Sequence, residues 1–459
     1  MNTTPEGMSP RSTSWRRRFW RLAVVVGLIV TIPVEIYLGV WLEAGYRLGR
    51  ERRRAEAGMA RLRAERVVRP NYFEPAIEGN SWELILPALQ KWKPTPTATE
   101  RVLFFTDKGD RPRGNPEDLD RILKMVQPGI EGLKEALHRC HAEPNHDYDA
   151  HIREGVPDVM EALSAFTVLS GAATHRQMQG RDSESLDYIL ICLGLADHLR
   201  VKGGGMHEMV GGTGDRLGFD ALKRLLAAHD MPESELARLS RALDRKESSW
   251  PDPLQVERWL EPQERHALVE AAAGGIPTDE FTLRWPDIPR WRYFYSDRIL
   301  FRRMLGPLDD QLEAARRIGR LPIPEMIQAA EARRMALKES KDPLARMCSG
   351  WVWYFTDFGR TRARMELARV ATALALYQAD RGYYPRDLGQ LVPRFIQAIP
   401  VDPLSGHPLK LLLRDSSAMI CANGWDGDDD HGRALKELPS GWPDLKADGD
   451  IVWTVKRRN

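Results

Sequence analysis

The chain has 459 residues, of which 42% are hydrophobic and 29% are charged, and its formal net charge is only +2. That length exceeds what one hydrophobic core usually serves, so we expect two or three folded units, and the composition excludes a disordered chain or a protein with many membrane passes. Residues 1–69 carry 14 arginines against 6 acids, whereas the rest of the chain has a small acidic excess, which argues against a nucleic-acid partner.

The cysteines are too widely spaced to form a CxxC pair or a zinc-ribbon pattern. A disulfide scaffold and a zinc ribbon are therefore both disfavoured. The four positions are Cys140, Cys192, Cys348 and Cys421.

A basic tail over residues 1–21 precedes an apolar stretch over residues 22–42. Twenty-one helical residues reach about 30 Å, the thickness of the hydrocarbon core of a bilayer. Trp20 and Trp41 lie at its two ends, where interfacial aromatic residues are common. The sequence therefore predicts a single transmembrane helix with the lipid bilayer as a partner. A cleaved signal peptide is the alternative, although the stretch is long for one.

Helical patterns dominate the next three hundred residues. Residues 43–93 are expected to form a solvated helical stalk and a first helix, and the proline-rich residues 94–115 to form a linker. Apolar residues then recur at three- and four-residue spacing over residues 116–350, beginning with the helix-start pattern at Pro116. This pattern predicts an all-helical domain.

Two features of this domain could carry chemistry. His207 and Glu208 lie in GGGMHEMVGGTG, but Gly211 replaces the second histidine of HExxH, and the glycine run lacks the ending of a phosphate-binding loop. A group of histidines (His138, His141, His146 and His151) surrounds Cys140. A metal site and a polar turn between two helices would both explain this group, and polar turns are the commoner case.

The C-terminal part of the chain has a different pattern. The segments ALALYQADRGYYP, DLGQLVP, IPVDPLSGHPL, ANGWDGDDDHG and DGDIVW follow one another within residues 357–455. In this order they resemble the globular part of the major pseudopilin of type II secretion systems. The resemblance implies a small α+β domain over residues 357–459, with a long helix, a short antiparallel sheet and a calcium-holding loop. The chain lacks the prepilin-peptidase site of that family, so we do not expect it to be processed and polymerised as a pseudopilin.

The acidic loop of this domain can be analysed without the family. Asp426, Asp428 and Asp430 alternate along it, and Ca²⁺ takes six to eight oxygen ligands from flexible loops of this kind. The twelve-position calcium loop would add Glu437, whereas the pseudopilin resemblance would add the aspartates of DGDIVW, namely Asp448 and Asp450. A solvated acidic turn without metal is the alternative.

Together these patterns predict a mainly α protein with a transmembrane helix, an all-helical middle domain and a small pseudopilin-like α+β domain. We expect a non-enzymatic, single-pass protein of the inner membrane with its body outside the cytoplasm. It would bind Ca²⁺ and act as a structural or interaction component among other envelope proteins of a secretion- or pilus-like assembly. The alternatives are a membrane-tethered enzyme with an unrecognised site in the helical domain, and a helical scaffold that faces the cytoplasm. The sequence does not indicate an oligomeric state.

Overall fold

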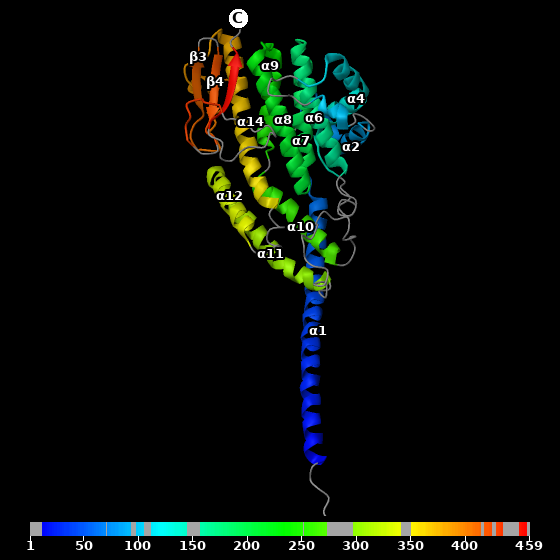
Figure 1. Ribbon diagram of the computed structural model, residues 1–459. Helices are drawn as coiled ribbons and strands as arrows, with labels where there is room; N and C mark the ends of the chain where they lie inside the picture. The colour runs from blue at the N-terminus through cyan, green and yellow to red at the C-terminus, as the bar shows by residue number, and fades with distance from the viewer. Residues whose placement is uncertain are drawn as a thin grey trace, which may run out of the picture.

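Helices make up most of the structure (Figure 1), as the sequence predicts. The computed structural model describes residues 12–69, 71–92, 98–104, 112–144, 157–250, 252–272, 297–340, 350–414, 417–424, 428–434 and 449–456. The helices are α1 (Ser12–Ala64), α2 (Trp82–Gln90), α3 (Ala98–Val102), α4 (Pro116–Ala136), α6 (Pro157–Met178), α7 (Asp182–Arg200), α8 (Gly205–Ala228), α9 (Glu233–Ser248), α10 (Pro253–Ala272), α11 (Asp297–Ile318), α12 (Ile323–Glu339) and α14 (Gly350–Arg381). The remaining elements are the 3-10 helix η2 (Leu388–Leu391) and the strands β1 (Ile77–Asn80), β2 (Arg139–His141), β3 (Lys410–Arg414), β4 (Ser417–Ala422) and β5 (Ile451–Lys456).

The predicted transmembrane helix is the main correction to the sequence analysis. Among the residues that the structure describes, no helix has an apolar stretch of the length that a bilayer crossing needs. Side chains of α1 are described from Glu35 onward. A spanning helix needs about 20 predominantly apolar residues, and this finding contradicts the prediction over residues 22–42. The inner-membrane localisation, the orientation and the bilayer partner all depend on that helix and are not supported either.

Helix α1 instead serves partly as a packing element of the body. Its first part projects away from the other helices (Figure 1), and its second part packs against α10 and α11. Ala44, Ala55, Met59 and Leu62 are buried, so residues 44–62 do not form the expected solvated stalk.

Helix α7 occupies the centre of the body, because it packs against α4, α6, α8 and α9. Residues 188–200 of α7 are all buried, although they include charged side chains. A helix that is covered on every side must be apolar almost all round or must pair its charges. The run from Tyr188 to Ala196 meets the first condition, and the end of the helix meets the second.

The glycine-rich segment around residue 211 is the N-terminal half of α8 and not a loop. Gly214 faces the ring of Phe166 on α6, and a Cβ atom at this position would lie only 2.6 Å from that ring. The glycine therefore permits a close approach of α6 and α8. The close packing explains the glycine at this position. The segment resembles a phosphate-binding loop only in its glycine content.

The C-terminal elements form the predicted long helix and small antiparallel sheet. The strand order is β3-β4-β5, with Leu412 opposite Met419 and Ile420 opposite Trp453. Helix α14 packs against β4 and β5 and also against α8, α9 and α12. One continuous cluster of buried apolar side chains extends from Met59 to Val455, so the sheet and the body share a core. The division into domains at 350–357 remains a prediction.

A second small sheet was not expected from the sequence. Strands β1 and β2 pair in parallel, with Ile77 opposite Arg139 and Asn80 opposite His141. The pairing joins two segments that are about sixty residues apart and places them beside α2 and α4. Strands of four and three residues give too short a pattern to be recognised in a sequence.

Candidate functional site

The most polar part of the body interior is a group of charged side chains between α7, α8 and α9. We call it the buried ion network, and it consists of Asp197, Arg200, Glu208, Asp215 and Lys246. The Arg200 guanidinium is 2.7 Å from Asp215 and 3.6 Å from Glu208, and the Lys246 ammonium is 2.5 Å from Asp197 and 2.8 Å from Asp215. Each charged group therefore has a partner of opposite sign, as buried charges require.

All five residues of the buried ion network are closed to solvent, with exposures of 0–6%. The Tyr72 hydroxyl donates a hydrogen bond to Asp197, and burial together with this carboxylate raises the pKa of Tyr72 well above its ordinary value. Desolvation lowers the pKa of the neighbouring Arg69, which is also buried. Apart from Glu208, these positions were missed in the sequence, because Asp215 is 15 residues from Arg200 and Lys246 is 49 residues from Asp197.

Glu208 is the member of the network with a pKa near neutrality. Burial raises its pKa to about 7, and this effect outweighs the attraction of Arg200 and Arg69. A shifted pKa of this kind is common in active sites but also occurs in structural ion pairs. Its side chain is 5% exposed, so the carboxylate is not presented to a substrate in this conformation.

His207 has a structural role at the start of α8. Its Nδ1 accepts a hydrogen bond of 3.1 Å from the Gly204 amide, which leaves Nε2 to donate to the Asp158 carboxylate at 3.2 Å. The ring therefore caps the helix N-terminus while it is 2% exposed. The geometry gives His207 and Glu208 separate partners rather than a shared acid-base pair.

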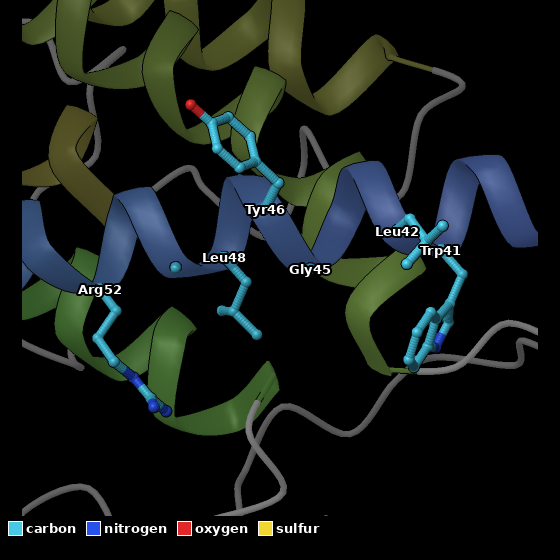
Figure 2. A pocket seen from close by; sticks show the side chains of 7 residues that line it. Trp41, Leu42, Gly45, Tyr46, Leu48 and Arg52 are labelled. Carbon is cyan, nitrogen blue, oxygen red and sulfur yellow. The ribbon is translucent and has the colours of Figure 1, made fainter.

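A surface hollow lies along α1, on the part of that helix that faces α10 and α11 (Figure 2). All its lining residues belong to α1, and Arg52 is the charged one among them. The lining is completed by Trp41, Leu42, Gly45, Tyr46, Leu48 and Gly49. Aromatic and aliphatic walls with one guanidinium offer binding surface, and the Tyr46 hydroxyl is the lining group of a type that serves in acid-base chemistry.

The predicted calcium ligands are only partly described by the structure. Asp426, Glu437 and Asp448 lie outside the described residues, whereas Asp428, Asp430 and Asp450 lie within them. The structure brings Asp430 and Asp450 together. The Asp450 carboxylate accepts hydrogen bonds from the amides of Asp430 at 3.3 Å and Gly432 at 2.7 Å.

Asp450 thus holds the acidic loop against the outer face of the sheet. It is 1% exposed, and its own amide donates to the carbonyl of Arg433 at 2.8 Å. Gly432 has a φ of +80° and lies against Leu412 of β3, a combination that favours glycine. Asp428 is exposed at the start of the described part of the loop.

Asp430 provides the feature that best fits a cation. Its side chain is 8% exposed, and one oxygen, Oδ2, is buried without a hydrogen-bond partner among the residues that the structure describes. Its other oxygen, Oδ1, accepts a bond of 3.0 Å from the Arg433 Nε. A buried carboxylate oxygen without a donor is a suitable ligand for Ca²⁺, although Arg433 competes for the same carboxylate.

The neighbouring Asp429 is directed to other partners. Its carboxylate pairs with Lys410 of β3 at 2.6 Å and with the exposed His431 at 3.2 Å. The Lys410 hydrogen bond is the largest of the effects that lower the pKa of Asp429. The Asp429 carboxylate is therefore paired with Lys410 on β3 and with His431, and it is not directed toward the other acidic side chains of the loop.

Comparisons of the chain with protein-family models, with curated proteins and with solved structures find no match. The pseudopilin resemblance therefore depends on the order of the five C-terminal segments alone.

Proposed function

We propose that the chain is a non-enzymatic structural protein that binds partner proteins of a secretion- or pilus-like assembly through its C-terminal sheet. The observation that carries this proposal is the free outer edge of β3. Strand β5, at the other edge, lies against α8 and α14, whereas β3 pairs only with β4 among the described residues. An edge strand offers unpaired amide and carbonyl groups to which another protein can add a strand.

The side chains of β3 support this role. Leu413 is 47% exposed, and Arg414 beside it is also exposed. Basic residues on an edge strand prevent indiscriminate pairing, so a partner would need complementary charge. An acidic strand or loop of a pilin-like protein could add to the edge of β3 and would also carry the complementary charge.

The body supports a scaffold role rather than catalysis. Its buried ion network is charge-paired and closed, which is the arrangement expected of a structural core and not of a site that receives substrate. Two of the three helices that carry this network, α8 and α9, also pack against α14. The sheet is therefore presented on a rigid support.

The test is site-specific photo-crosslinking of the full chain in the cells that produce it. A photoreactive residue at Leu413 should give a discrete adduct with a pilin-like or secretion-apparatus protein, identified by mass spectrometry. Met335 on α12 is 41% exposed and provides a matched control position away from the sheet. We expect the control to give no such adduct.

Two outcomes would contradict the proposal. The first is the absence of an adduct at Leu413 when the protein is folded, and the second is the same set of adducts from both positions. An adduct that contains only a second copy of this chain would indicate self-association instead of a partner protein.

We further propose that the acidic loop binds Ca²⁺ with Asp430 as a ligand, because its buried Oδ2 has no donor. A ligand that binds only the folded state stabilises it by about 2.7 kcal/mol when its free concentration is about 100 times Kd. Saturating Ca²⁺ should therefore raise the unfolding midpoint of the full chain. Asp430→Asn should abolish this rise, and Arg433→Gln should increase it by removing the competing cation.

Asp429→Asn is the matched control for the calcium experiment. It makes the same change of charge one residue away, at a carboxylate held by Lys410, and should retain the response. The calcium proposal fails if the unmodified chain shows no shift, if Asp430→Asn responds equally, or if Mg²⁺ produces the same shift.

A further inference from the structure

The parallel pairing of β1 and β2 brings three metal-binding side chains together at the surface. Glu78 comes from β1, and Cys140 and His141 are neighbours on β2. Their sulfur, nitrogen and oxygen ligand atoms all lie within 4.8 Å of one another. The sequence pointed to the cysteine and the histidine, but Glu78 is about sixty residues away and only the strand pairing reveals it.

The distances between these atoms are close to those of a coordinated ion. The Glu78 Oε2 is 3.4 Å from the Cys140 Sγ and 3.0 Å from the His141 Nε2. Tetrahedral zinc with bonds of about 2.0–2.3 Å separates its ligand atoms by roughly 3.3–3.7 Å. The Cys140 Sγ and the His141 Nε2 lie within 4.8 Å of each other, so rotation of these side chains is the adjustment that would bring all three ligand atoms around one ion.

The backbone around the cluster is fixed on both sides. The Ile77 amide donates to the His138 carbonyl at 2.8 Å, and the Ser81 amide donates to the His141 carbonyl at 2.9 Å. Beyond the strands, the Asn80 side chain bonds both the carbonyl and the amide of Glu143, at 2.8 and 2.9 Å. The three ligands are thus held on a rigid support rather than on separate loops, which favours a preorganised site.

We propose that Glu78, Cys140 and His141 form a Zn²⁺ site with one coordination position open to solvent. Thiolate, imidazole and carboxylate together suit zinc, whereas Ca²⁺ and Mg²⁺ take oxygen ligands almost exclusively. The side chains of Glu78 and His141 are 87% and 39% exposed, so an ion can enter from solvent. Three protein ligands leave the fourth position to water or to a donor group of a bound molecule.

Titration of the full, reduced chain with Co²⁺ as a spectroscopic probe tests this site. Cobalt should produce a thiolate-to-metal charge-transfer absorption in the near ultraviolet, and Zn²⁺ should remove it at one equivalent. Cys140→Ser should abolish the band. Groups that only orient a ligand typically contribute 10–100-fold to metal affinity, so His141→Gln and Glu78→Gln should each lower the affinity by at least about 10-fold.

His138→Gln is the matched control, because this nearby histidine bonds the Pro75 carbonyl and lies at a tilt against the Phe73 ring instead of joining the cluster. It should leave the cobalt affinity unchanged. The proposal is overturned if the unmodified chain gives no band, if the band persists in Cys140→Ser, or if His138→Gln and His141→Gln weaken binding equally. Circular dichroism of each variant separates loss of metal binding from loss of folding, and the Glu78 and His141 variants keep the test decisive if the cysteine variant does not fold.

Discussion

Arg200 ends the most deeply buried helix of the body, and its guanidinium lies between the carboxylates of Asp215 and Glu208. Charges in such a position contribute less to net stability than their distances suggest, because each group has lost its hydration. Removal of one partner, in contrast, typically costs 3–5 kcal/mol, since it leaves a buried charge without compensation. The network therefore determines which helix packing is allowed more than it adds to the free energy of unfolding.

Glu208 leads to a prediction about pH. Its pKa is about 7 in the folded chain against the ordinary value of 4.5, so the folded state binds the proton more tightly. As the pH rises from about 4.5 to 7, this group should lower the free energy of unfolding by about 3 kcal/mol. Glu208→Gln removes that titration. The stability of the variant relative to the unmodified chain should therefore increase up to about pH 7 and then level off.

Urea unfolding midpoints measured between about pH 5 and pH 8 check this prediction. The same comparison for Glu313→Gln, at an exposed position on α11, serves as the control. The raised pKa of Glu208 would be contradicted if the unfolding midpoints of Glu208→Gln and the unmodified chain differ by the same amount at every pH in this range.

Single residues of the candidate sites were predicted unevenly from the sequence. Asp430 could be named because alternating acidic residues in a glycine-containing loop form a local pattern, and Asp450 was named only through the pseudopilin resemblance of DGDIVW. Lys246 and Asp215 could not, since neither is near the other in sequence and each looks like an ordinary surface charge on an amphipathic helix. Burial of a charged residue depends on which helices surround it, and this is a property of the tertiary structure.

Among the elements, α8 depends most on close packing. Gly214→Ala adds a methyl group 2.6 Å from the ring of Phe166, which is itself fully buried. We expect this overpacking to cost about 1–3 kcal/mol of unfolding free energy, despite the better helix propensity of alanine. Thermal or urea unfolding of the variant measures the effect.

Gly49 on α1 provides the matched control, because among the described residues no atom beyond its chain neighbours and its own helix backbone lies within 4 Å of the position its Cβ would occupy. Gly49→Ala should stabilise the chain by about 0.5–1 kcal/mol through the helix propensity alone. Equal effects of the two substitutions would show that α6 and α8 are not in close contact at Gly214.

Element type was predicted best where the apolar period was long. Helix α4 begins at Pro116 and buries the predicted stripe that includes Leu119 and Ile122. The transmembrane prediction over residues 22–42 failed, because no helix among the described residues has an apolar stretch long enough to cross a bilayer. In the structure α1 continues as one helix to Ala64, and its later turns are charged and packed against the body.

At the scale of the whole molecule, α14 connects parts that the sequence analysis treated separately. The predicted boundary near residue 357 follows a real change in sequence pattern, from helical repeats to short strands and turns. Helix α14 nevertheless packs against α8, α9 and α12 on the body side and against β4 and β5 on the other. A sequence pattern reports the type of each element but not which elements share a core.

The shared core also affects how the chain is made. Met59 and Val455 belong to the same apolar cluster, so its first and last contributors leave the ribosome almost four hundred residues apart. Helices α8 and α9 are synthesised well before α14, which covers them in the folded protein. Their apolar faces therefore remain exposed until α14 has been synthesised. Because chains generally fold from the N-terminus during synthesis, this shared core can be completed only after α14 and the C-terminal sheet have been synthesised.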